Sequence, residues 1–244
     1  MKNKNSSLPI KQSLQTEIVL SWILAGLMTT LSIIGLTFQS QIYPSNELVK
    51  SFVANDAVNL LVGLPVLAFA LILTIRRQLL GLLFWPGALF YVFYTYLVYL
   101  FAMPFNLNYL FYIVILSLSV WLSFRVINTM DGEYIQHNLR GMVKTRPGAG
   151  ALIILGFGFA IRALIQIGSG LNNKVALTGS EMALNTSDLI LSLAWIICGL
   201  ALWRQTPLGF LTGGGLLYQG SMLFVGVIVV ILIHPSSMQN QLTS

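Results

Sequence analysis

The chain has 244 residues, of which 56% are hydrophobic and only 8% are charged. Soluble domains carry about 25% charged residues, so a soluble globular domain is excluded. The formal net charge is +6, but there is no soluble basic face that could bind nucleic acid. The composition predicts an all-α integral membrane protein whose first partner is the lipid bilayer.

Seven apolar stretches are long enough to cross a bilayer, which takes about 20 helical residues. The first of them is longer than a signal-peptide core of about 7–15 residues, so we expect it to be retained as a helix. The predicted spans lie at about 18–38, 57–75, 79–103, 107–127, 149–168, 188–203 and 208–233, and together they form a transmembrane domain over 17–233.

Lysine and arginine predict the orientation, because cytoplasmic loops carry an excess of both. With the N-terminal tail 1–16 inside, ten of these residues lie on the inner side, and two, Lys50 and Lys174, lie on the outer side. The C-terminal tail 234–244 contains neither residue type and lies outside in this prediction.

The longest inner loop is predicted to hold a surface helix at about 132–144. A helix there places four apolar side chains on one face, those of Ile135, Leu139, Met142 and Val143. The alternative is a plain connecting loop.

Two predicted hairpins resemble each other and indicate an internal repeat. The first carries Asp56, Arg77, Gly87 and Tyr91, and the second carries, in the same order, Asp188, Arg204, Gly214 and Tyr218. A duplication predicts two parallel repeats of three helices joined by the fourth, with a site between them; the alternative is chance similarity. This 3+1+3 layout is similar to that of SWEET and PQ-loop proteins, although the chain has no Pro-Gln pair and the predicted orientation is opposite.

Arg162 places a permanent cation within the apolar stretch 149–168. It lies about 20 Å along the helix from the inner end, which is the outer half of a core about 30 Å thick. A charge at that depth costs several kcal/mol unless it is paired or hydrated. We expect Asp56, Asp188 or both to be its counter-ions.

Two alternatives compete with this ion pair. Arg162 could snorkel to the outer surface without a partner. Asp56 and Asp188 follow Asn55 and Ser187, which are good N-cap residues, so both acids could serve only in the first turn of their helices.

Further polar side chains are predicted at the same level, and we expect them to line a polar cavity open to the outside. Tyr91 and Tyr94 are predicted to pack with their hydroxyls hydrogen-bonded, and Tyr96 and Tyr99 to lie in the interfacial aromatic belt. The candidate ligand-binding residues are Arg162, Asp56, Asn59, Asp188, Gln166, Tyr91, Tyr94, Tyr112 and Gln219.

Other features point to packing rather than chemistry. Gly209 and the glycines at 213–215 predict a close contact between helices. A single cysteine, Cys198, excludes an internal disulfide. The chain has no Walker A, His-Glu-x-x-His or Gly-x-Ser-x-Gly motif, and we expect neither a metal nor a cofactor.

Four stretches carry a resemblance to a group of prokaryotic multi-pass membrane proteins that has no assigned activity. They read "ANDAVNLLVGLPVL", "LLFWPGALFYVFYTYLVYLF", "PFNLNYLFYIVILSLS" and "SDLILSLAWIICGLALWRQTPLGF". The resemblance implies the helix count and a location in the plasma membrane.

Three functions are open at this point. The first is a transporter or binding protein for a small anionic or zwitterionic solute or a lipid headgroup, with Arg162 as the anion contact. The second is a sensory or accessory subunit, in which the polar residues form a structural network and a membrane-protein partner or a second copy is bound. The third is an enzyme that modifies a lipid, with Asp56 or Asp188 as acid or base.

Overall fold

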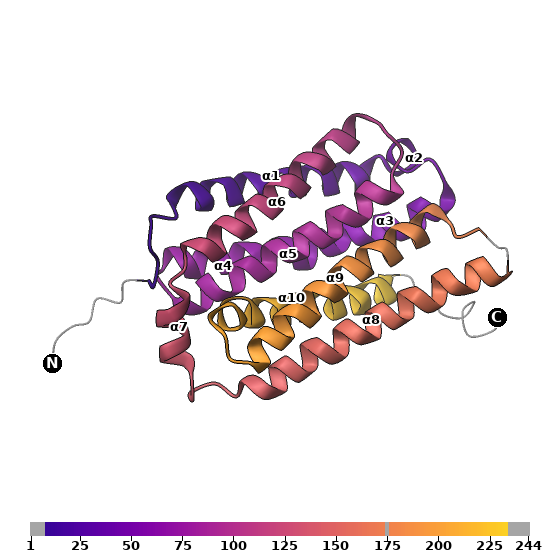
Figure 1. The fold of residues 1–244 in the computed structure, drawn as a ribbon. Helices are drawn as coiled ribbons and strands as arrows, with labels where there is room; N and C mark the ends of the chain where they lie inside the picture. Colours follow the sequence, from indigo (N-terminus) through magenta and orange to yellow (C-terminus); the bar gives the residue numbers. More distant parts are fainter. Residues whose placement is uncertain (1–7, 174–175, 234–244) are drawn as a thin grey trace.

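The computed structural model describes residues 8–173 and 176–233, which form a bundle of long helices (Figure 1). Seven helices in this part of the chain are long and apolar enough to cross a membrane, as predicted. They are α1 (Gln15–Thr37), the continuous rod of α3 (Asn46–Val58), η1 (Asn59–Gly63) and α4 (Leu64–Ile75), then α5 (Leu79–Ala102), α6 (Leu107–Thr129), α8 (Thr145–Asn173), α9 (Gly179–Trp203) and α10 (Pro207–Ile233). The chain is therefore an all-α multi-pass membrane protein.

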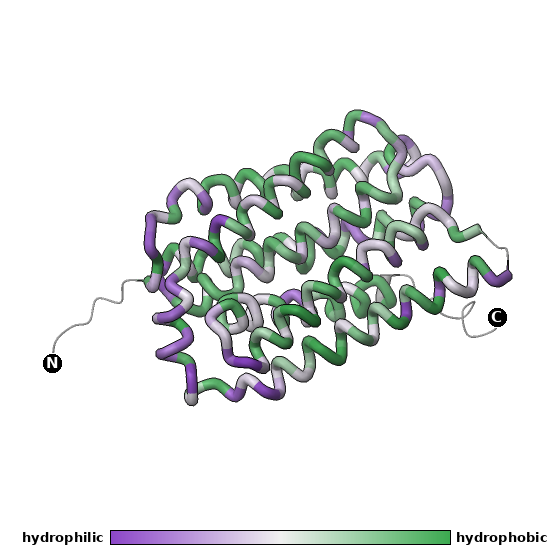
Figure 2. The backbone as a smooth tube through the Cα atoms, in the orientation of Figure 1, coloured by the Kyte–Doolittle hydropathy of each residue, from purple (hydrophilic) through white to green (hydrophobic). Residues whose placement is uncertain are grey.

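Hydropathy agrees with this architecture. Figure 2 shows apolar residues along the middle of the bundle and hydrophilic residues gathered toward its two ends. One end holds α7 (Gly132–Leu139), and the opposite end holds α2 (Gln39–Ile42) (Figure 1). Which end faces the cytoplasm stays a prediction, and the predicted outer tail 234–244 lies outside the described residues.

The second and sixth spans begin two to three turns earlier than predicted. Ser45 caps the second span by accepting a hydrogen bond from the Leu48 N–H, 3.2 Å. Thr178 caps the sixth span in a capping box with Glu181. Asp56 and Asp188 therefore lie inside their helices, and the prediction that they serve in a first helical turn is wrong.

A π-helical segment interrupts the second span. The N–H of Leu64 donates to the carbonyl of Asn59, five residues earlier instead of four. The next residue is Pro65, which has no N–H and whose ring would clash with the preceding turn of a regular helix. The wider π turn accommodates this proline, and it adds one residue to the helix.

α5 is the central helix of the bundle, packed against α4, α6, α9 and α10. Gly87 of α5 lies directly on the backbone of Gly215 in α10, where a Cβ atom would collide with the carbonyl oxygen. Gly209 and Gly213 lie against Leu202 of α9, so the predicted glycine contact is confirmed at three positions. It is wrong for Gly214, which faces open space.

The two hairpin turns are built alike. Each has a second residue in the left-handed region, Arg77 with φ 57° and Gln205 with φ 53°. In both turns, three consecutive N–H groups donate to carbonyls four, three and five residues earlier. In the first turn these bonds run from Arg76 to Ile72, Arg77 to Thr74 and Gln78 to Leu73. In the second turn they run from Arg204 to Leu200, Gln205 to Leu202 and Thr206 to Ala201. Arg76, and not Arg77, therefore corresponds to Arg204, so the alignment of the sequence analysis is wrong by one residue.

The corrected register gives the repeat a geometric meaning. Gly87 corresponds to Gly215, and these two glycines contact each other where α5 and α10 cross. The first unit consists of α1, the α3–α4 rod and α5, and the second consists of α8, α9 and α10, joined by α6 and α7. Matching helices run in the same direction (Figure 1), which the 3+1+3 arrangement of parallel units requires and which any seven-helix bundle of alternating direction also has.

Before the π segment, the correspondence between the second span and α9 changes by one more residue, because the π turn holds one extra residue. Leu64 corresponds to Ser192, and its N–H donates to Asn59. In the regular helix α9 the residue four positions before Ser192 is Asp188. Asn59 therefore corresponds to Asp188, and Asp56 corresponds to Asn185.

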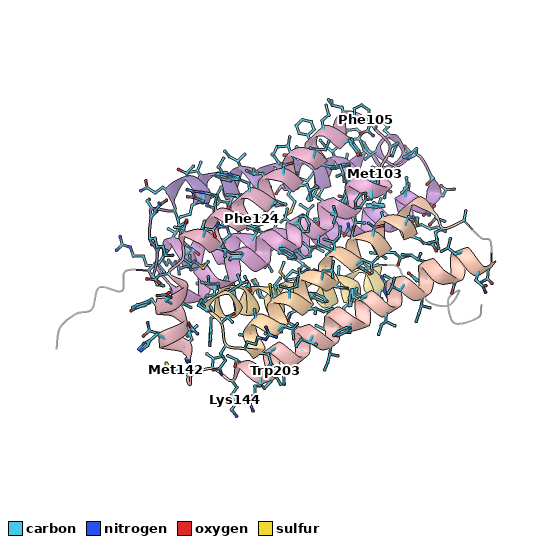
Figure 3. The ribbon with its side chains drawn as sticks, in the orientation of Figure 1. Met103, Phe105, Phe124, Met142, Lys144 and Trp203 are labelled. Carbon is cyan, nitrogen blue, oxygen red and sulfur yellow. The ribbon has the colours of Figure 1, made fainter. Side chains whose placement is uncertain are left out.

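The loop between α6 and α8 forms a shorter helix than the predicted segment 132–144. α7 ends at Leu139, because Gly141 adopts a left-handed φ of 85° that a helix cannot continue. The Gln136 side chain donates to the Gln205 carbonyl, 2.6 Å, which joins α7 to the second hairpin turn. Ile135 is buried as expected, whereas Met142, labelled in Figure 3, is 82% exposed.

Candidate functional site

Arg162 of α8 forms an ion pair with Asp188 of α9. Its Nη2 contacts Oδ2 of Asp188, and the Tyr94 hydroxyl of α5 donates to Oδ1 at 2.7 Å. Asp188 is fully buried, whereas the Arg162 side chain is 44% exposed. The open choice of counter-ion is thus decided in favour of Asp188, and Arg162 does not snorkel without a partner.

Buried polar atoms without hydrogen-bond partners lie on α9 and α10. Asn185 is one turn from Asp188, and neither its Oδ1 nor its Nδ2 has a hydrogen-bond partner in the described structure. The same holds for Oγ of Ser187 and for Nε2 of Gln219 in α10, whose Oε1 accepts from the Trp195 indole at 2.8 Å. All of these side chains are fully buried. Unsatisfied polar atoms are costly within a membrane, so the Asn185 amide, one turn from Asp188, is the part of the structure best placed for a polar ligand or water.

Asp56 lies in a different environment. Its Oδ2 accepts a hydrogen bond from the Tyr43 hydroxyl, and its Oδ1 accepts one from the Tyr99 hydroxyl at 2.7 Å. Gly35 of α1 makes room, because a Cβ atom at that position would collide with the carboxylate. Asp56 is buried and forms no salt bridge within the described residues.

Asn59 links this carboxylate environment to α1 and α5. Its amide nitrogen lies 3.4 Å from the Ser32 hydroxyl, and its Oδ1 accepts from the Tyr91 hydroxyl at 3.5 Å. Gly63 lies against the Tyr91 ring, where a Cβ atom would be 2.6 Å from Cε1. The π segment thus positions an amide and a tyrosine together.

The two groups form a pair of related half-sites. The first half-site is Asp56, Asn59, Ser32, Tyr43, Tyr91 and Tyr99, and the second is Asn185, Asp188, Arg162 and Tyr94. The acid and the amide exchange places between them, as Asp56 and Asn59 in one and Asn185 and Asp188 in the other. In both, the second of these positions contacts the first helix of its own unit and a tyrosine of α5.

The remaining predicted residues lie apart from a shared cavity. Gln166 is exposed on α8, one turn beyond Arg162. Tyr112 of α6 is buried against the Tyr99 ring, with centroids 5.2 Å apart. Tyr91 and Tyr94 have hydroxyl partners as predicted, but Tyr96 and Tyr99 are buried rather than interfacial, so that prediction is wrong.

The cavity of the bundle also differs from the expectation. A volume of about 340 Å³ lies between α5, α6, α9 and α10, with apolar lining that includes Phe93, Phe124, Ala194 and Leu216. None of the nine predicted ligand-binding residues lines it. Several of the polar side chains instead form direct hydrogen bonds with one another.

The sequence analysis missed Tyr43, Tyr99, Ser32 and Asn185 as site residues. Asn185 could have been found as a polar residue three positions before Asp188, which places both on one helix face. Tyr43 had no local signal, since it lies in the connection between α2 and α3 and reaches Asp56 only through the fold.

The chain was compared with protein-family models, with curated proteins and with solved structures, and no match was found. Among the described residues, no group of three or more His, Cys, Asp and Glu side chains is placed to hold a metal ion. The chemistry available at the half-sites is therefore that of one guanidinium, two carboxylates, amides and phenols.

Proposed function

We propose that this protein binds a small anionic or zwitterionic solute at the second half-site and moves it across the plasma membrane. The observation that carries the proposal is the Arg162–Asp188 pair, one helical turn from the buried Asn185 amide, whose polar atoms have no hydrogen-bond partner among the described residues. An ionisable residue within a membrane is expensive and is expected to serve a function.

The guanidinium of Arg162 has capacity for an anion. It carries five N–H donors, and within the described residues its Nη2 alone engages Asp188. Its side chain is 44% exposed on α8, and guanidinium groups bind carboxylate and phosphate through two parallel hydrogen bonds. An anionic group on Arg162 would release Asp188 to pair with an ammonium group of the same solute.

The unpartnered atoms supply directional contacts. Within the second half-site, the Asn185 amide offers a donor and an acceptor. A few placed polar groups within apolar walls are the usual composition of a small-molecule site. This chemistry favours a solute that has hydrogen-bonding groups beside its charge.

The plasma-membrane location rests on the resemblance to prokaryotic multi-pass proteins. The site would then lie toward the outer leaflet, since lysine and arginine place the α7 end inside. A phospholipid headgroup presents the same anionic chemistry as a free solute, so the test must separate the two sources.

The deciding experiment identifies the small molecules and lipids that co-purify with the wild type and with Arg162→Gln. Mass spectrometry gives the inventory, and a melting curve is recorded for each protein. Arg125→Gln is a matched control, because Arg125 pairs with Glu17 and its side chain is 46% exposed against 2% for the acid. The corresponding values for Arg162 and Asp188 are 44% and 0%.

We expect one species that the wild type and Arg125→Gln retain and that a normally melting Arg162→Gln loses. A water-soluble anion or zwitterion supports the proposal, and an anionic phospholipid assigns the headgroup source. Equal inventories in all three proteins, with Arg162→Gln melting no better than Arg125→Gln, would make the ion pair structural. An accessory-subunit role would then replace the proposal.

A further inference from the structure

The buried carboxylates of the two half-sites have different partners. Asp188 has a cation at contact distance, whereas Asp56 is held by two phenol hydroxyls. We propose that Asp56 binds and releases one proton, and that this proton is the coupling ion of the protein. The coupling part rests on the proposed function, but proton binding at Asp56 does not.

Among the described residues no cation forms a salt bridge with Asp56, and α1 presents Ser32 and Gly35 to it. The connection before α3 supplies the Tyr43 hydroxyl, and α5 supplies the Tyr99 hydroxyl. Tyr112 of α6 packs on the Tyr99 ring, as does Tyr96 of α5, 5.5 Å away between centroids. A buried carboxylate without a cationic partner is unfavourable in a membrane, and a proton is the smallest ligand that removes its charge.

The geometry favours a proton over a metal ion. Both carboxylate oxygens already accept a phenol O–H, and Oδ1 of Asn59 accepts the hydroxyl of Tyr91. A hard cation needs several free oxygen ligands, and here the hydroxyls point their hydrogens at the acid. A proton instead adds to one carboxylate oxygen, and the new O–H can donate to the phenol oxygen beside it. Water supplies the proton, and no other bond is broken.

Tyr43 connects Asp56 to the end of the bundle. It lies directly after α2, and both Pro44 and Ser45 next to it are exposed, although its own ring is buried. On this proposal the proton passes between water at this end and Asp56 by way of the Tyr43 hydroxyl, which donates to Oδ2 of Asp56. This is the end opposite α7 (Figure 1).

The internal repeat makes the assignment specific. The counterpart of Asp56 is Asn185, an amide that cannot titrate. α5 contacts both half-sites, through Tyr91 and Tyr99 on one side and Tyr94 on the other. A change of charge at Asp56 would alter the tyrosine contacts of α5, and α5 also contacts Asp188 of α9 through Tyr94, which is the physical route for coupling.

Infrared difference spectroscopy of the full chain in lipid nanodiscs, recorded while pH is stepped, tests proton binding. We expect a carbonyl stretching band of a buried protonated carboxyl group that titrates in the wild type. The band should disappear in Asp56→Asn and persist in Asp188→Asn. Tyr99→Phe removes one hydrogen-bond donor of Asp56 but keeps the acid, so the band should persist with a changed frequency and a changed midpoint pH. This variant replaces Asp56→Asn as the test if Asp56→Asn does not fold.

Two results would overturn the proposal. One is a titrating band that Asp56→Asn and Tyr99→Phe leave unchanged. The other is no titrating band together with a melting temperature that rises in sodium chloride and not in choline chloride, which would assign a metal cation. Because no solute is added, these results are independent of the inventory test on Arg162.

Discussion

At the scale of single residues, some buried polar side chains have hydrogen-bond partners among the described residues and others have none. Gln219 and Asn185 are both fully buried amides, yet only Gln219 has a partner, the Trp195 indole. Replacing a paired amide leaves its partner without a hydrogen bond and lowers the free energy of unfolding. Replacing an unpaired amide removes a buried unsatisfied group and raises the free energy of unfolding.

We predict that Asn185→Leu raises the free energy of unfolding by about 1–2 kcal/mol, since it removes an unpaired buried amide while keeping the volume similar. Gln219→Leu should lower it by a similar amount, because the Trp195 N–H would lose its acceptor. Thermal melting of both variants in one detergent measures the pair. Destabilisation by Asn185→Leu would show that the amide has a partner after all.

The space beside Asp56 gives a second prediction at this scale. Gly35→Ala should destabilise the protein by about 1–3 kcal/mol, because its Cβ would collide with the carboxylate and the Tyr43 hydroxyl. Gly26 on the same helix faces open space, so Gly26→Ala is the matched control and should be neutral or slightly stabilising. Equal melting temperatures for the two variants would contradict the close packing of α1 on Asp56.

At the scale of elements, two glycines let α5 and α10 cross with their backbones in contact. Gly87 and Gly215 occupy corresponding positions of the repeat, so the contact lies where the two units meet. Small residues at such crossings are typical of transmembrane helix pairs, since they let dispersion contacts form along both helices.

Gly87→Ala should therefore lower the free energy of unfolding by at least about 1–3 kcal/mol, since a Cβ there meets backbone atoms of Gly215 that cannot rotate away. Gly214→Ala, which faces open space on α10, should have little effect. Unfolding of both variants in detergent tests the difference. A tolerated Gly87→Ala would mean that α5 and α10 are not in backbone contact.

At the scale of the whole molecule, each end of the bundle has an exposed residue at which its side of the membrane can be tested. Figure 3 places Met142 and Lys144 near α7, and Phe105 at the opposite end of the bundle. Met142 is 82% exposed and Phe105 is 78% exposed, so cysteines at either position would be accessible to a reagent. The excess of lysine and arginine predicts that the α7 end is cytoplasmic.

This orientation predicts a labelling pattern for intact cells. In a Cys198→Ser background, a membrane-impermeant thiol reagent should modify Phe105→Cys directly and Met142→Cys only after permeabilisation. The reverse pattern would invert the topology and would place Arg162 and Asp56 nearer the cytoplasmic leaflet. Labelling of the unmodified Cys198→Ser protein is the background control.

The sequence predicted the spans well and the site only in part. Hydropathy is a local property of about 20 residues, so all seven helices could be found from it. The beginnings of the second and sixth could not, because Ser45 and Thr178 cap helices whose first turns are polar and extend past the apolar stretch. This error placed Asp56 and Asp188 at helix ends when both are helix-interior residues.

What the sequence by itself determined is the membrane class, the helix count and the presence of an unusual cation at Arg162. Which acid pairs with that cation, and in which register the repeats match, only the tertiary structure decided. Both depend on contacts between residues far apart in the chain, such as Tyr43 with Asp56 and Tyr94 with Asp188, and on a one-residue π turn. Periodicity along a helix shows which face a side chain occupies, but the helix packed against that face is set by the fold.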